Sequence, residues 1–80
     1  MKVARMADVK RMIAHGGAVR FIYKTSLAIL VSADGEIRYQ LDRRTYDAFL
    51  RAIAHQLPRT ESGSAETNDL VIEWKQKPRP

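Results

Sequence analysis

The chain is 80 residues long, contains no cysteine and carries a formal net charge of +5 at neutral pH. A chain of this length forms one small domain with a limited core, and the lack of cysteine excludes disulfides and thiolate metal sites. The charge is uneven, because residues 1–59 hold eleven Lys and Arg against five Asp and Glu, whereas residues 60–69 hold three acids and no base. We expect a single domain over residues 1–80, and its basic part favours an acidic partner, of which nucleic acid is the commonest kind.

Nothing in the hydrophobic pattern predicts a membrane segment. Residues 1–8 have no apolar core of the kind found in signal peptides, and the longest apolar run, Leu27–Val31, is far too short to cross a bilayer. We therefore expect no membrane association and a cytoplasmic location.

The first predicted element is a helix that begins near Ala7. Val9, Met12 and Ile13 recur at the spacing of one helix face. Gly16 follows these residues and can adopt the left-handed conformation that ends many helices.

Residues Ala18–Ser32 alternate between apolar and other residues and are predicted to form the centre of the core. The stretch is too long for one straight strand in so small a domain, so it must turn. A three-residue loop at Lys24–Ser26 pairs Tyr23 with Leu27 and puts all odd-numbered residues on one face of the sheet. A bulged continuous strand is the alternative. The apolar odd-numbered residues are Val19, Phe21, Tyr23, Leu27, Ile29 and Val31.

A turn, a strand and a second helix follow. Asp34-Gly35 is a strong hairpin signal, and the alternation in Glu36–Leu41 predicts a strand with Ile37, Tyr39 and Leu41 inward. Asp42 is placed to cap a helix over Arg43–Leu57, which Pro58 would end.

The last third of the chain is read as a tethered strand. Arg59–Asn68 is polar and predicts a flexible loop, Asp69–Lys75 alternates as a strand, and the basic tail Gln76–Pro80 is expected to be disordered. The ordered core is then about residues 7–57 plus the strand at 69–75. Because of its long tether, Leu70–Lys75 could also add to a neighbour's sheet and form a homodimer.

The element order is α-β-β-β-α-β, which predicts an α+β fold. We expect a small two-layer sandwich in which two helices cover one face of an antiparallel sheet. From about Ala7 to Leu57, with Arg43 and Arg44 at the start of the second helix, this order is similar to that of double-stranded-RNA-binding domains and the small toxins that share their fold. The turn Tyr23–Ser26 lacks the histidine that such toxins use, and the loop and lysine motifs of the RNA-binding family are missing. The resemblance implies a topology and no functional residue.

Catalysis is not expected. His15 and His55 each fall in the last turn of a predicted helix, where an imidazolium suits the helix dipole, and no positioned partner is evident. Gly16-Gly17 leads from helix to strand, the reverse of a phosphate-binding loop. The sequence has no metal-ligand spacing and predicts no cofactor, no metal and no catalytic residue.

The basic residues form two candidate groups. Arg43 and Arg44 begin the second helix, where a phosphate or carboxylate could bind. The alternative is an ordinary solvated helix face, in which Asp42 and Asp47 neutralise the two arginines locally and Asp47 can reach both Arg44 and Arg51. The second group has outward parity on the sheet and forms either a basic contact face or a guard against edge aggregation. The candidate binding residues are Arg20, Lys24, Arg38, Arg43, Arg44, Arg51 and Lys75.

Outward parity also includes Ile22, Leu30 and Val71, so the open face would be basic and partly apolar, as macromolecular contact surfaces are. All six aromatic residues have inward parity, which leaves none for stacking on single-stranded bases and favours contact with phosphates and shape. The leading hypothesis is thus a non-enzymatic protein that binds nucleic acid. The alternatives are a phage- or mobile-element-type accessory protein that inhibits or adapts a host protein complex, such as a nucleic-acid-binding defence complex, and a dimeric structural subunit.

Overall fold

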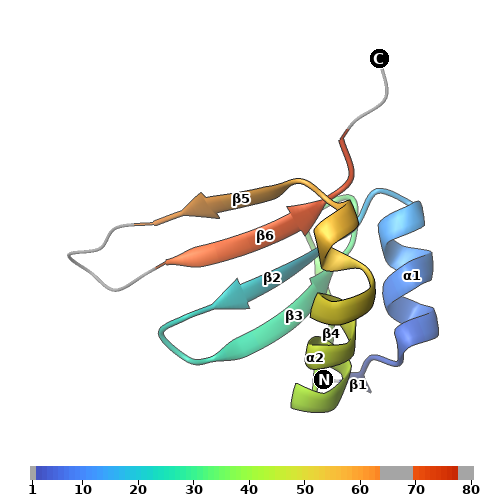
Figure 1. Cartoon of the computed structure of the whole chain (residues 1–80), viewed down its shortest axis with the longest axis horizontal. Coiled ribbons are helices and arrows are strands. Elements are labelled where there is room, and N and C mark those ends of the chain that lie inside the picture. Colours follow the sequence, from blue (N-terminus) through green and yellow to red (C-terminus); the bar gives the residue numbers. More distant parts are fainter. Residues whose placement is uncertain (1, 64–69, 78–80) are drawn as a thin grey trace.

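A six-stranded sheet with two helices on one face makes up the computed structural model, which describes residues 2–63 and 70–77 (Figure 1). The strands are β1 (Lys2–Val3), β2 (Ala18–Ile22), β3 (Leu27–Val31), β4 (Ile37–Leu41), β5 (Arg59–Ser62) and β6 (Val71–Lys75). The helices are α1 (Met6–Ala14), α2 (Arg43–Ala52) and the short 3-10 helix η1 (Ala54–Gln56). The predicted α+β class, with both helices against one face, is confirmed.

The sheet is mixed and is larger than the sequence predicted. Its strand order is β1-β4-β3-β2-β6-β5, with β1 parallel to β4 and every other pair antiparallel. The sequence did not predict β1, because its two residues are too few to show an alternating pattern. The interpretation of Arg59–Asn68 as a loop was wrong for Arg59–Ser62, which form β5, a fully exposed edge strand with no apolar side chain. The remainder of that predicted loop at 64–69, and residues 78–80 of the predicted tail, lie outside the described residues.

The β2–β3 hairpin differs from the prediction in its loop length. Ile22 pairs with Leu27, so the connection has four residues, and Ser26 takes a left-handed φ of 52°. An even-numbered loop turns β3 over relative to the three-residue expectation. Leu30 is therefore fully buried under the helices, whereas the predicted inward residues Ile29 and Val31 lie on the other face.

β4 carries a second difference. Val31 pairs with Ile37 while Leu30 pairs with Tyr39, so Arg38 is an extra residue in a β-bulge. Ile37, predicted to point inward, is 51% exposed.

The local helix signals were correct. Gly16 ends α1 with a φ of +90°, and the Asp42 carboxylate accepts a hydrogen bond from the Thr45 amide at 2.8 Å. The second helix is shorter than predicted, because α2 ends at Ala52 and continues only as η1. α1 and α2 lie side by side over one part of the sheet, and the β2–β3 turn projects beyond them (Figure 1).

β6 occupies an internal position, which removes the predicted dimer edge. It pairs with β2 on one side and β5 on the other, and its Ile72 and Trp74 are buried in the core. The segment Leu70–Lys75 therefore offers no free backbone edge to a second copy.

Candidate nucleic-acid interface

The first turn of α2 presents two arginines to solvent. Asp42 is extended, with φ −72° and ψ 169°, and caps the helix through Thr45. This capping fixes Arg43 and Arg44 at the first two helical positions, where both side chains are exposed. The hydrogen bonds from Thr45 lower the pKa of Asp42, so its carboxylate stays ionised at neutral pH.

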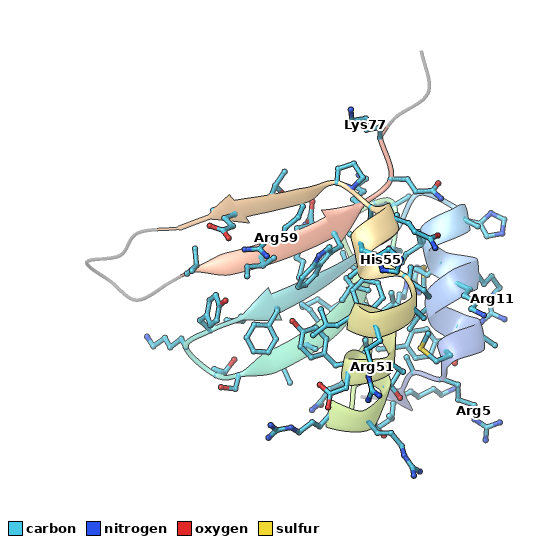
Figure 2. All side chains as sticks on the ribbon, viewed as in Figure 1. Arg5, Arg11, Arg51, His55, Arg59 and Lys77 are labelled. Carbon is cyan, nitrogen blue, oxygen red and sulfur yellow. The ribbon has the colours of Figure 1, made fainter. Side chains whose placement is uncertain are left out.

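The arginines of α2 form no ion pair with the acids near them in the described residues. Within residues 2–63 and 70–77, no carboxylate lies within 4.0 Å of Arg43, Arg44 or Arg51. Asp47 is therefore not ion-paired with Arg44 or Arg51, whereas the charge of Arg44, after the hydrogen bonds from Thr45, helps to lower the pKa of the adjacent Asp42. Arg51 and His55 lie on the side of the helix layer turned away from the sheet (Figure 2). Together, Arg43, Arg44 and Arg51 form what we call the α2 basic ridge.

Two of the cations predicted on the open face of the sheet form ion pairs, unlike the arginines of α2. Arg20 of β2 pairs with Glu73 of β6 at 2.5 Å, and Arg38 pairs with Glu36 at 3.0 Å. Lys75, at the end of β6, is exposed. Two of the four cations predicted for the open face, Arg20 and Arg38, are thus paired with acids and are poorer candidates for phosphate contacts than Lys24 and Lys75.

The open face also carries apolar side chains, beside polar ones such as Gln40 and Thr60. Ile29 and Val31 are buried there although no helix covers them, and Ile22, Leu27 and Val71 are half-buried. The earlier expectation had placed Leu30 on this face, but Leu30 lies in the core and Leu27 replaces it.

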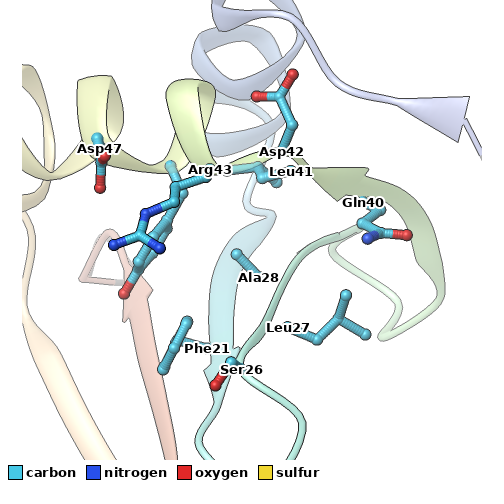
Figure 3. Close-up of a pocket in the computed structure, with 10 residues that line it drawn as sticks. Phe21, Ser26, Leu27, Ala28, Gln40, Leu41, Asp42, Arg43 and Asp47 are labelled. Carbon is cyan, nitrogen blue, oxygen red and sulfur yellow. The ribbon is translucent and has the colours of Figure 1, made fainter.

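A cleft of about 390 Å³ opens between the first turn of α2 and the β2–β3 hairpin (Figure 3). Phe21, Leu27 and Ala28 form part of its apolar wall. Its polar lining consists of Ser26, Gln40, Asp42, Arg43, Tyr46 and Asp47. Lys24, another predicted binding residue, is exposed in the same β2–β3 turn as Ser26. The cleft thus connects the α2 basic ridge with the tip of the hairpin.

Aromatic side chains line the approach to this cleft. Tyr23 is 46% exposed, while Phe21 and Tyr46 are half-buried. The prediction that these aromatic residues point inward was correct, since they lie on the side of the sheet that faces the helices. The conclusion that no aromatic ring remains accessible was wrong, because the helices do not extend over this end of the sheet (Figure 1).

The two histidines lie at different places on the surface, His15 as the C-cap of α1 and His55 within η1. Both His15 and His55 are exposed at helix ends. In residues 2–63 and 70–77, no three His, Cys, Asp or Glu side chains gather as metal ligands would. Neither α1 nor α2, nor η1, has the length and apolar character needed to cross a membrane, and these are the helices of the described residues.

Comparison with protein-family models gives no match, and comparisons with curated proteins and with solved structures give none either. Function is therefore inferred from the chemistry of the chain's own residues.

Proposed function

We propose that this protein is a non-enzymatic nucleic-acid-binding protein that contacts phosphates through the α2 basic ridge. One observation carries the proposal: Arg43, Arg44 and Arg51 are exposed without a carboxylate within 4.0 Å in the described residues, whereas Arg20 and Arg38 of the sheet are paired. Cations that are not held in an ion pair can meet phosphates without first giving up that pair, and here Asp42 and Asp47 lie near the ridge without forming one.

The surroundings of the ridge suit a polyanion. Arginine offers a planar fork of N–H donors that matches phosphate oxygens, and the first amides of a helix point toward its N-terminus. The exposed Lys24 extends the positive surface across the cleft toward the hairpin. We also propose that the protein acts in the cytoplasm, where it would encounter nucleic acid and nucleic-acid complexes.

The test is fluorescence anisotropy with labelled oligonucleotides over a salt series. We expect wild-type affinity to fall steeply with salt, and the Arg43→Gln/Arg44→Gln variant to bind more weakly to every sequence. Each lost phosphate contact should reduce the log–log slope by about 0.7 to 0.9. The matched control is Lys10→Gln/Lys77→Gln, which removes the same charge from exposed positions outside the first turn of α2. Equal losses in the two variants would show that net charge, and not the ridge, governs binding.

A second candidate function is supported by the apolar open face. Ile22, Leu27 and Val71, together with the 51% exposed Ile37, surround a neutral ion pair, a composition that suits a protein partner. An accessory protein that inhibits or adapts a host protein complex would use such a surface. Binding to a purified complex that persists at high salt and is lost in Ile37→Glu would support it, since phosphate-driven contacts weaken with salt.

A further inference from the structure

The uncovered end of the sheet exposes a row of aromatic rings on the same side as the α2 basic ridge. We call Tyr23, Phe21 and Tyr46 the aromatic strip. Tyr23 continues the pairing of β2 with β6, since its amide donates to the Leu70 carbonyl at 3.1 Å. This hydrogen bond fixes the backbone of Tyr23 beyond the region that α2 covers.

The rings are held in a defined arrangement. Phe21 and Tyr46 stack with centroids 5.0 Å apart and planes 10° from parallel, and Tyr23 meets Phe21 edge-on at 5.2 Å. Behind them Tyr46 contacts the buried Trp74 at 6.0 Å. Of the three residues Tyr23 is the most exposed, at 46%, so its ring is the most accessible to a planar ligand.

Charged side chains of both signs lie near this strip, since Asp42 and Asp47 line the cleft together with Arg43. Arg43 lines the same cleft as Phe21 and Tyr46, and Lys24 follows Tyr23 directly in the chain. Arg59 of β5 pairs with Trp74 in register and so lies on the same face of the sheet, where its guanidinium forms an ion pair with Glu61 (Figure 2). Burial raises the pKa of Tyr46 to about 12, and the positive charge of Arg59 acts against that rise, as expected for a guanidinium near the strip.

We propose that the aromatic strip stacks the bases of a single-stranded nucleic acid whose phosphates lie along Arg43 and Lys24. This inference rests on the proposed function and gives it a substrate class. An aromatic ring flanked by cations is the combination that single-strand binders use, since every base offers a π-face and every nucleotide a phosphate. The bases of a duplex are stacked on each other and cannot reach Tyr23, so the strip adds nothing to duplex affinity.

The test compares a single strand with a duplex of the same length by anisotropy, using wild type, Tyr23→Ala and Tyr23→Phe. We expect Tyr23→Ala to weaken single-strand binding by about five- to 150-fold while duplex affinity and the salt slope stay unchanged. Tyr23→Phe should retain single-strand affinity, because the ring and not the hydroxyl carries the contact. The matched control is Ile37→Ala, which removes exposed apolar surface from the opposite face.

Other outcomes would overturn the inference in distinguishable ways. If Arg43→Gln/Arg44→Gln weakens binding but Tyr23→Ala does not, the strip is not a base platform and the proposed phosphate contact still holds. Equal losses for single strand and duplex in Tyr23→Ala would likewise exclude stacking. If the wild type binds neither oligonucleotide at low salt, both proposals fail and the strip becomes a surface for a protein partner. Thermal unfolding of each variant identifies any loss that arises from misfolding.

Discussion

Ile22 of β2 pairs directly with Leu27 of β3, and this one relationship decides which side of β3 enters the core. It places Val19 opposite Leu30 and Phe21 opposite Ala28, all on the helix face of the sheet. The pairing that the sequence favoured, Tyr23 with Leu27, would have exposed Leu30.

The orientation of β3 can be tested with two leucine truncations. Leu30 is completely buried, so Leu30→Ala should lower the free energy of unfolding by about 2–5 kcal/mol. Leu27→Ala should cost much less, because Leu27 is half-buried on the open face. Urea unfolding of both variants measures the difference. A larger loss of stability in Leu27→Ala than in Leu30→Ala would instead support the three-residue loop.

Gly17 is required by a close approach between α1 and β3. A Cβ at this position would lie 2.5 Å from Met12 Cγ and 2.6 Å from the Val31 carbonyl oxygen. We expect Gly17→Ala to destabilise the fold by about 1–3 kcal/mol through overpacking, as measured by chemical denaturation. Gly35→Asn is the control, since Gly35 has a left-handed φ but no atom near its missing side chain. A harmless Gly17→Ala would mean that this approach is looser than described.

Acid should weaken the helix starts. Hydrogen bonds from Thr45 lower the pKa of Asp42 below 3.8, and the Arg5 amide, followed by Arg11, does the same for Asp8. Because the folded values lie below the unfolded ones, this stabilisation is fully present above the unfolded pKa and is lost as pH falls through the folded values.

We therefore expect the melting temperature to hold from neutral pH down to about 4 and to fall below it. Asp42→Asn keeps an oxygen that can accept the Thr45 hydrogen bond but cannot titrate, so it should show a shallower fall. Calorimetry or circular dichroism at a series of pH values measures it. Identical acid profiles for wild type and Asp42→Asn would remove Asp42 from this explanation.

Removal of β6 should unfold the chain and not merely dissociate it. β6 pairs with strands on both sides and buries Ile72 and Trp74, so a chain that ends at residue 69 loses the middle of one half of its sheet. Circular dichroism should show no cooperative transition for this truncation. A chain that ends at Lys77 keeps β6 and serves as the control. A folded truncated chain with half the wild-type mass in solution would revive the hypothesis of a dimer through Leu70–Lys75.

Local signals in the sequence were enough for several elements. The cap at Asp42, the turn at Asp34-Gly35 and the end of α1 at Gly16 depend on hydrogen bonds and dihedral angles within a few residues, which the residue types alone specify. The arginines at the start of α2 followed from the same cap. These elements also established the α+β class.

Only the tertiary structure decided features that depend on residues far apart in the chain. Arg20 forms an ion pair with Glu73, 53 positions away in the chain. The sequence could show that Arg20 lies on the open face of the sheet, but not that an acid lies beside it. Alternation identifies the two sides of a strand, but which side is buried depends on loop length and on the strands and helices that pack against it. Tyr23 has the parity of a core residue and is nevertheless exposed, because α2 does not reach that end of the sheet.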